Sequence, residues 1–417
     1  MNPGALGGLL GTSTPERRRV RVLFFAEAVT LAHVARPYAL ASKLPEDCFD
    51  VAFATHPRYA QLFGATTWNS AELETISTDV FQQALAHGKP VYDRCTLRRY
   101  VEEDSRLIDE MRPDVIVGDF RISLSISARK ARLPYINITN AYWSPYASPD
   151  WVAPVMPVSR YLGPRASSSL FRAIRPVAFA VHAKPLNDVR KLHGFPPLPS
   201  DVRYAYTDGD VTLYADLPGL IPLRHQPPSH RQLGPVHWSP TLSMPSWWDN
   251  LPDGRGLVYV NLGSSGQLRL LPAILDALAS EHYIVVVATA GRSLDIATRN
   301  NVYEAPFLDG AAFARRAVLV VCNGGSPATQ QAILSGAPVL GIPSNLDQFL
   351  NMGYVERAGL GISCRADEAS VTSIRAGFRR VVDDPKLLQA AASISQKTDL
   401  EETDRAFRSA IASLYPA

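Results

Sequence analysis

The chain has few cysteines and no long hydrophobic run. Its four cysteines, Cys48, Cys95, Cys322 and Cys364, are widely scattered and form no C-x-x-C pair. This pattern is typical of free thiols in a reducing compartment rather than of a disulfide framework or a zinc site. No segment reaches the ~18 consecutive apolar residues of a transmembrane helix, and the N-terminus places its apolar residues before its charges, the reverse of a secretory signal. We therefore expect a cytoplasmic protein without a membrane span.

An excess of charge of one sign is also missing. Lys and Arg number 42 against 39 Asp and Glu, the net charge is +3, and no run of five basic residues occurs. Nucleic acid is therefore not an expected partner. The chain has 417 residues, of which 46% are hydrophobic and 19% charged. That length is enough for two or three folded domains that need no disulfide or metal to hold a core.

Short apolar runs alternate with helical patterns in both halves of the chain. This alternation predicts parallel sheets covered by helices, the α/β class. In the first half, buried strands are predicted at 20–26, 51–55, 115–119 and 135–139, with helices at about 33–44 and 122–132. In the second half, strands are predicted at 257–262, 283–289, 318–322 and 338–342, and two helices between 370 and 414 with a break at 383–385. Over 140–250 the pattern is looser, and we expect loops and helices that flank a cleft, including a basic helical stretch at 186–194.

A stretch dense in Pro, Gly and Trp separates the two halves and marks a linker. We expect a disordered lead at 1–19, an N-terminal domain at 20–235, a linker at 236–256, and a second domain at 257–385.

Two glycine turns follow predicted strands of the second domain. Gly324 and Gly325 run directly into a helical pattern, and the sequence LGSSG occupies 262–266. Backbone amides at such a turn and at a helix N-terminus bind anions, and open α/β sheets bind ligands at the carboxyl ends of their strands. A Gly-Gly pair can also do no more than permit a tight turn. Neither turn is a dinucleotide fingerprint or a P-loop.

The segment 321–351 resembles the nucleotide-sugar domain of the bacterial macrolide-type and plant UDP-glycosyltransferases. That family's signature runs His-Gly-Gly, Glu, Gly-x-Pro, Ile-Pro and Asp-Gln. At the same spacing this chain has Asn323-Gly324-Gly325, Gln331, Gly336-Ala337-Pro338, Ile342-Pro343 and Asp347-Gln348. The resemblance extends over nearly the whole chain. It implies the GT-B fold, two facing Rossmann-like domains with parallel sheets and a cleft between them, and a C-terminal helix at 386–417 that packs back on the N-terminal domain.

The resemblance also implies a donor site in the second domain. Gly263, Ser264 and Ser265 would face the diphosphate, the backbone of Leu308 would meet the nucleobase, and Asp347 and Gln348 would bind the transferred sugar. The remaining residues that the family pattern assigns to the nucleotide sugar are Asn323, Gly325, Ser326, Ala328 and Gln331. Two of these depart from the family: Asn323 replaces a His and Gln331 replaces a Glu. Because an amide carries no charge, we expect weaker or altered donor binding.

His33, near the start of a predicted helix, and Asp119, at the end of a predicted strand, match the family's catalytic base and its partner. From the residues alone, a structural histidine is about as plausible. A neutral imidazole can take the proton of an acceptor hydroxyl at pH 7, and a carboxylate on its other nitrogen fixes the tautomer and stabilises the imidazolium. The resemblance implies one displacement with inversion, with no metal and no cofactor besides the sugar nucleotide.

Several other residues have two readings. Glu27 is either a second carboxylate near the base or, as we favour, a locally paired residue. Tyr142, Trp143 and Tyr146, together with Trp151, could form an apolar wall for an acceptor. As core or interdomain packing they would need no ligand.

The sequence therefore predicts an inverting, metal-independent glycosyltransferase that moves a sugar from a nucleoside diphosphate, UDP or dTDP, to a small aromatic or hydrophobic natural-product acceptor. Two alternatives remain. Asn323 and Gln331 are compatible with a degenerate, non-catalytic homologue that acts as a binding or auxiliary protein. Another GT-B enzyme, such as a sugar-nucleotide epimerase or a lipid-linked sugar transferase, is the second.

Overall fold

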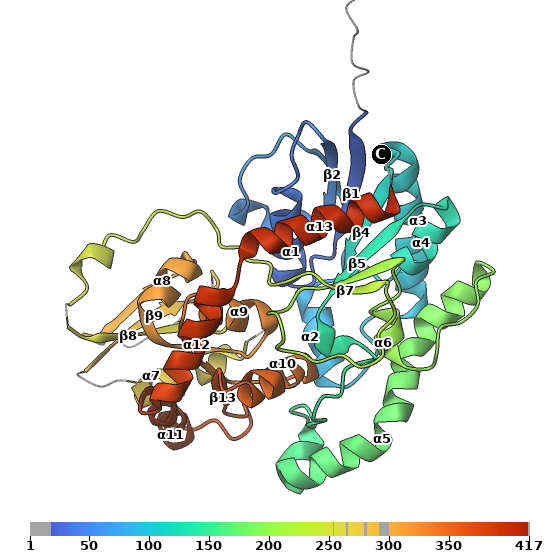
Figure 1. Ribbon diagram of the computed structural model, residues 1–417. Helices are drawn as coiled ribbons and strands as arrows, with labels where there is room; N and C mark the ends of the chain where they lie inside the picture. Colours follow the sequence, from blue (N-terminus) through green and yellow to red (C-terminus); the bar gives the residue numbers. More distant parts are fainter. Residues whose placement is uncertain (1–17, 253, 264–265, 279–281, 292–299, 416–417) are drawn as a thin grey trace, which may run out of the picture.

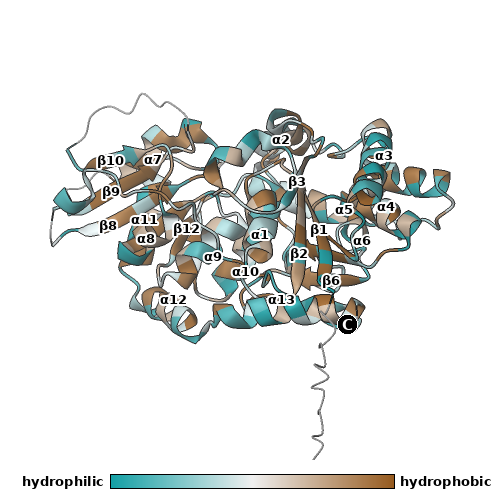
Figure 2. Cartoon of the chain, turned by 90° about the horizontal axis from the view of Figure 1, so that it is seen from above, coloured by the Kyte–Doolittle hydropathy of each residue, from teal (hydrophilic) through white to brown (hydrophobic). Residues whose placement is uncertain are grey.

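Two parallel β-sheets, each flanked by helices, lie side by side in the computed structural model (Figure 1). The structure describes residues 18–252, 254–263, 266–278, 282–291 and 300–415. Strands of both sheets consist largely of apolar residues, whereas the surrounding helices are mixed (Figure 2). This is the composition expected of parallel strands that are covered on both faces. The predicted α/β fold with two Rossmann-like units is confirmed.

The first sheet has seven strands in the order β3-β2-β1-β4-β5-β6-β7, and all neighbouring strands are parallel. Its strands are β1 Val20–Ala26, β2 Phe49–Thr55, β3 Asn69–Glu72, β4 Val115–Asp119, β5 Tyr135–Thr139, β6 Val211–Tyr214 and β7 His230–Gln232. The α-helices of this half are α1 Ala32–Ala41, α2 Thr78–Ala86, α3 Arg94–Met111, α4 Leu124–Ala131, α5 Pro157–Leu192 and α6 Val202–Ala205. Two short 3-10 helices, η1 Pro57–Leu62 and η2 Ala141–Trp143, follow β2 and β5.

The second sheet has six strands in the order β10-β9-β8-β11-β12-β13, again all parallel. Its strands are β8 Gly256–Asn261, β9 Tyr283–Ala288, β10 Val302–Ala305, β11 Ala317–Cys322, β12 Val339–Gly341 and β13 Gly361–Ser363. The helices are α7 Leu271–Leu278, α8 Gly310–Arg316, α9 Ser326–Leu334, α10 Leu346–Arg357, α11 Val371–Val382, α12 Pro385–Lys397 and α13 Leu400–Leu414, with the 3-10 helix η4 Leu268–Leu270. Between β7 and β8 the described residues contain one short 3-10 helix, η3 Trp248–Asn250.

The region 140–250 is more regular than its sequence pattern indicates. The predicted basic stretch at 186–194 is the end of α5, a helix of 36 residues whose backbone is non-helical at Gly163. Two short strands, β6 and β7, also lie in this region; β6 has only four residues, and β7, which is His-Arg-Gln, has no apolar pattern. Despite the length of α5, no helix in the described part of the chain is long and apolar enough to cross a membrane.

The C-terminal region forms three helices rather than the predicted two. A new helix begins after Asp399, whose carboxylate accepts a hydrogen bond from the backbone N–H of Glu401 at 2.8 Å and so caps α13. Helix α12 contacts α9 of the second half, whereas Phe407 and Ile411 of α13 pack into the core of the first sheet beside Phe24. The last two helices therefore connect the two halves (Figure 1).

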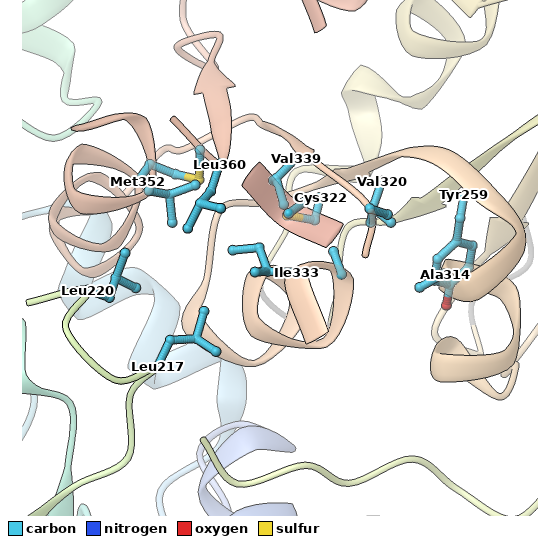
Figure 3. Packing of buried hydrophobic residues seen from close by; sticks show 14 of the residues in the cluster. Leu217, Leu220, Tyr259, Ala314, Val320, Cys322, Ile333, Val339, Met352 and Leu360 are labelled. Carbon is cyan, nitrogen blue, oxygen red and sulfur yellow. The ribbon is translucent and has the colours of Figure 1, made fainter. Parts of the chain in front are cut away.

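An apolar cluster also joins the two halves. Leu217 and Leu220, from the segment after β6, lie close to Ile333 of α9 and Met352 of α10 (Figure 3). All four side chains are buried. Because burial of such side chains favours close contact of the two halves, this cluster helps to fix the walls of the space between them.

Each sheet has a point at which its strand order reverses. In the first sheet β1 and β4 are neighbours, and in the second sheet β8 and β11 are neighbours. The chain leaves such strands in opposite directions, which opens a crevice at their carboxyl ends where α/β proteins bind ligands. Asp119 is the last residue of β4, and His33 lies in α1, the helix that follows β1. Gly263 and Asn323 follow β8 and β11.

Candidate active site

A cavity of about 640 Å³ lies between the two sheets. It has the size and the mixed polar and apolar lining of a small-molecule site. The first half contributes residues from the carboxyl ends of β1, β4 and β5, and the second half contributes the turns after β8 and β11 and the start of α10. Most of the predicted site residues line it: His33, Asp119, Tyr142, Trp143, Gly263, Leu308, Asn323, Gly325, Ser326, Ala328, Gln331, Asp347 and Gln348. Ser264 and Ser265 lie outside the described residues.

His33 and Asp119 form a hydrogen-bonded pair at the first-domain side of the cavity. The distance from His33 Nδ1 to Asp119 Oδ1 is 2.8 Å. The carboxylate is buried, with 1% of its side chain exposed, whereas the imidazole is partly exposed. Phe120 stacks on the imidazole, with ring centroids 4.6 Å apart and planes 13° apart, and has a positive φ of 60°. With Nδ1 held by Asp119, Nε2 is the nitrogen that can accept a proton.

Arg36 is a third member of this group that the sequence analysis missed. Its guanidinium binds Asp119 in a fork, with Nε at 2.6 Å from Oδ2 and Nη2 at 2.9 Å from Oδ1. Burial by itself would raise the pKa of Asp119, but Arg36 and the hydrogen bond from His33 outweigh it and lower that pKa. Asp119 therefore stays ionised. The sequence did contain a signal for Arg36, because this residue follows His33 by three positions and therefore lies on the same face of the predicted helix.

A chain of hydrogen bonds connects this group to the second domain. Arg36 Nη1 donates to Asn140 Oδ1 at 3.0 Å, and Asn140 Nδ2 donates to Ser326 Oγ at 2.9 Å. Gln330 Nε2 donates to the same hydroxyl at 2.7 Å. Ser326 is the first residue of α9, so the chain runs from His33 across the interface to the N-terminus of that helix. Neither Asn140 nor Gln330 belongs to a motif that sequence reasoning could have used.

The predicted anion site has the backbone that it needs. Gly325 is the N-cap residue of α9, and its N–H donates to Asn323 Oδ1 at 3.0 Å. The other end of that amide lies toward Gly263, because a Cβ on Gly263 would come within 3.4 Å of Asn323 Nδ2. Gly263 has a φ of +64°, which a glycine adopts without strain. The turns after β8 and β11 thus meet at Asn323, beside the positive end of the α9 dipole.

Gln331, which replaces the family's Glu, is held by local contacts. Its Nε2 donates to the backbone oxygen of Trp238 at 3.4 Å. Its side chain also lies against Gly310, where a Cβ would fall 2.1 Å from Gln331 Oε1. The neighbouring Asp309 accepts hydrogen bonds from the N–H groups of Ala311 and Ala312 and caps α8. Gly310 therefore leaves room for Gln331, and Asp309 begins the helix.

Asp347 faces the first domain, whereas Gln348 is largely used in a helix cap. Asp347 Oδ1 accepts a hydrogen bond from Trp143 Nε1 at 2.7 Å across the interface. Gln348 Oε1 accepts from the N–H of Ser344 at 2.8 Å, and Asn345 caps the N–H of Gln348 at 3.0 Å. A hydrogen bond from Gln348 to a ligand would therefore have to come from its Nε2.

The aromatic segment divides between cavity and packing. Tyr142 and Trp143 line the cavity. Tyr146, predicted to contact the acceptor, lies outside the cavity lining, because its ring packs edge-on against His230 with centroids 5.3 Å apart. Trp151 packs under the guanidinium of Arg175 at 4.2 Å and also lies outside the lining. For these two residues the packing interpretation holds.

An apolar arm of the cavity was not visible in the sequence. It is formed by α2 and α5, which contribute Phe81, Leu85, Phe171 and Phe179. These residues belong to helices that lie far apart along the chain, so no local pattern brings them together.

The buried carboxylate of Glu27 proves to be structural. Glu27 Oε2 binds Arg121 Nη1 at 2.9 Å, both side chains are fully buried, and Glu27 also accepts from the Tyr100 hydroxyl. This is the local pairing that we favoured.

Among the described residues, no group of three or more His, Cys, Asp or Glu could hold a metal ion. The chain does contain an Asp-x-Asp sequence at 208–210, but Asp208 binds Arg129 and Arg190, and Asp210 accepts from the N–H of Tyr135.

Comparisons with known proteins agree with this architecture. The family model described as "Erythromycin biosynthesis protein CIII-like, C-terminal domain" matches residues 272–403. Among solved structures, the spinosyn rhamnosyltransferase SpnG superposes with a TM-score of 0.65 at 19% identity and covers 94% of this chain and 99% of its own. SpnG has also been solved with thymidine diphosphate and with spinosyn aglycone. The fold and the two-sided cleft are those of a GT-B glycosyltransferase.

Relatives in sequence identify the family. A "PGL/p-HBAD biosynthesis rhamnosyltransferase" of Mycobacterium bovis is 47% identical over 378 residues, which is 91% of this chain and 84% of the relative. A "PGL/p-HBAD biosynthesis glycosyltransferase" of Mycobacterium tuberculosis is 44% identical over 393 residues, 93% of this chain and 92% of the relative. A third relative, from Mycobacterium bovis, is 45% identical over 275 residues and is named as inactive. The chain belongs to the glycosyltransferase family of these relatives, and it has the GT-B fold.

Proposed function

We propose that this glycosyltransferase moves a sugar, with inversion and without a metal ion, from a UDP- or dTDP-linked donor to a hydroxyl of an aromatic or hydrophobic acceptor. The observation that carries the proposal is the hydrogen-bonded pair of His33 and Asp119, 2.8 Å apart, which faces the N-terminus of α9 in the same cavity. A base on one wall and an anion site on the other are what a direct displacement requires.

The base side follows from the orientation of His33. Asp119 holds Nδ1, so Nε2 takes the acceptor proton as the new bond to the sugar forms. The buried carboxylate then stabilises the imidazolium. Because attack comes from the first-domain wall and the diphosphate leaves toward the second, the two partners act on opposite faces of the sugar carbon, and its configuration inverts.

The donor side rests on backbone groups rather than on charge. The N–H groups in the first turn of α9, which begins at Ser326, and the turn at Gly263 would face the leaving diphosphate. Asn323 adds an amide where the family has a His. Asp347 and Gln348 are the sugar-binding candidates, and Leu308, which also lines the cavity, is the candidate for the nucleobase.

The acceptor side is supported by the apolar arm. Trp143 and Tyr142 lie between the base and the second domain, and Phe81 and Phe171 extend an apolar surface away from the base. A flat ring with an aliphatic extension fits that surface by burial of apolar area.

The test is a transfer assay with the purified full chain. UDP- and dTDP-linked glucose and rhamnose are combined with phenolic esters of increasing alkyl chain length, and the product is identified by mass spectrometry. The rhamnosyl donor is included because one relative bears that name. The anomeric configuration of the product, read by NMR, distinguishes inversion from retention. Product formed from the donor without any acceptor would instead support an epimerase.

A pair of histidine variants tests the role of the base. His33→Ala should lower kcat at least ~100-fold, as removal of a general base does. His193→Ala, at the end of α5 and outside the cavity lining, is the matched control and should keep full activity. Equal activity of the two variants, with both folded, would show that His33 is not the base. Donor binding without turnover in the unmodified chain would support the non-catalytic alternative.

A further inference from the structure

Helix α5 carries a row of exposed apolar side chains that has no partner in the described structure. Leu170, Ile174, Val177 and Val181 follow one another at helical spacing, so they share one face. Their exposed fractions lie between 44% and 69%. Monomeric proteins normally scatter exposed apolar residues singly, and a continuous row marks a surface that binds something. We call these four residues the outer stripe.

The charges around the outer stripe indicate the chemistry of the partner. Lys184 and Lys191 are exposed beside the stripe, on one flank of it, whereas the exposed Arg165 and Arg172 lie on the far side of the same helix. The only acidic residue in the sequence of α5 is Asp188, which is paired with Lys184. An apolar row on a helix whose remaining exposed surface is rich in basic side chains is the pattern of a helix that lies on an anionic lipid surface. Two copies of this chain joined by their stripes would bring these basic groups together, which disfavours self-association.

The outer stripe is continuous with the cavity. Phe171, Ala178 and His182 on the other side of α5 line the apolar arm, and Ile174 belongs both to the lining and to the outer stripe. His182 Nε2 lies 3.1 Å from the backbone oxygen of Gly88, just after α2, which connects the two helices at this end. The helix runs along one edge of the molecule (Figure 1). A lipid surface on the outer stripe would therefore lie beside the apolar end of the cavity.

We propose that the outer stripe and its basic neighbours dock the protein on an anionic membrane surface. The four apolar side chains enter the headgroup region, and the Arg and Lys side chains bind lipid phosphates. No helix spans the bilayer in this arrangement. Docking itself depends only on α5. Docking would also place the apolar end of the cavity next to a lipid-borne acceptor for His33, and this second step rests on the proposed function.

Vesicle binding of the full chain tests the proposal. Unilamellar vesicles of equal parts phosphatidylcholine and phosphatidylglycerol are compared with pure phosphatidylcholine in a flotation assay, at low salt and at 0.5 M salt. We expect binding to the anionic vesicles that weakens with salt, and little binding to the neutral ones. No binding of the unmodified chain to anionic vesicles at low salt would overturn the proposal.

Two matched double variants assign the surface. Val177→Asp with Val181→Asp should reduce the bound fraction about tenfold or more, because it places two charges in the stripe. The control, Leu242→Asp with Met244→Asp, adds the same charge at exposed apolar positions between β7 and β8, outside the cavity lining. It should bind nearly as the unmodified chain does. Equal loss in both variants, or no loss in the first, would refute docking through α5.

Two further measurements distinguish membrane docking from self-association and from failure of the proposed function. Sedimentation velocity without vesicles should show the same species for the unmodified chain and the stripe variant; an oligomer that the stripe variant dissociates would make the stripe a self-interface and overturn the proposal. Transfer to a short water-soluble acceptor should be unchanged in the stripe variant. If transfer fails for every protein while vesicle binding behaves as expected, the proposed function fails and the docking surface stands.

Discussion

Removal of Arg36 tests whether the base group works as the geometry indicates. Arg36→Met keeps most of the side-chain volume and removes the fork that holds Asp119, whose carboxylate is 1% exposed. Loss of one partner of a buried ion pair costs about 3–5 kcal/mol, because the other charge is left without compensation. Here His33 remains bound to Asp119, so we expect the lower part of that range and a fall of several degrees in Tm. Arg36→Lys, which keeps the charge but not the fork, should recover part of this loss.

The pH profile separates a catalytic consequence from mere loss of stability. Arg36 lowers the pKa of Asp119, so in Arg36→Met the Asp119 carboxyl takes up a proton at a higher pH than in the unmodified chain and then no longer supports His33 as a base. The acidic limb of kcat/KM should therefore move to higher pH. Arg99→Met, which removes an exposed pair with Glu74, is the control and should change neither Tm nor the limb appreciably. An Arg36→Met variant with unchanged Tm and an unchanged limb would refute the reasoning.

Three further predictions follow. Asp216, just after β6, lies outside the cavity lining and accepts hydrogen bonds from Asn140 Nδ2 at 2.8 Å and from the N–H of Ala141 at 2.6 Å. Burial raises the pKa of Asp216 to about 6, so the native state keeps a proton that the unfolded chain releases near pH 4. The unfolding free energy of the unmodified chain relative to Asp216→Asn should thus fall by up to about 3 kcal/mol as pH rises from about 4 to about 6, and stay level above that; urea titrations at stepped pH measure this, and a difference that rises through the window would contradict it. Trp143→Phe removes the hydrogen bond to Asp347, worth about 1.5–3 kcal/mol; kcat/KM for the sugar donor should fall at least about tenfold while calorimetry finds unchanged affinity for the nucleoside diphosphate alone, and equal losses in both would place Asp347 outside the sugar site. Treatment with EDTA should leave the transfer rate within about twofold, because backbone N–H groups are proposed to stabilise the leaving diphosphate; a rate restored only by added Mg²⁺ would show the opposite.

The sequence predicted those parts of the fold that depend on local pattern. Runs such as 20–26 and 115–119 are apolar except at Arg21 and Asp119, and the strands β1 and β4 occupy those same residues. The strands β6 and β7 have only four and three residues and lie among prolines and charged residues. They are too short to form an apolar run that the sequence would reveal. Helix α5 contains three prolines in its interior and a non-helical Gly163, which break the pattern that would have marked its full length.

The candidate site was predictable where a motif fixes the backbone and unpredictable where a side chain reaches across the molecule. Gly263 and Asn323 follow strands that the pattern reveals, and a turn at the end of a parallel strand has its place set by the sheet. Tyr146, four residues from Tyr142, nevertheless points elsewhere, because the chain turns after η2 and its ring meets His230. Closeness in sequence outside a helix or strand therefore carries little information about a shared wall.

The hydrogen-bond chain through Arg36 and Asn140 suggests why the base was hard to recognise from its residues alone. Asp119 is bound by His33 on its own domain, yet the guanidinium that fixes it is in turn held by Asn140, which reaches Ser326 on the other domain. Each link joins residues more than eighty positions apart, so neither a motif nor a helical spacing contains the whole arrangement. Because the last link lies at the start of α9, any ligand that draws on Ser326 alters a contact of the group that orients His33. The geometry of the base is thus a property of the two domains together, which a sequence read one segment at a time does not contain.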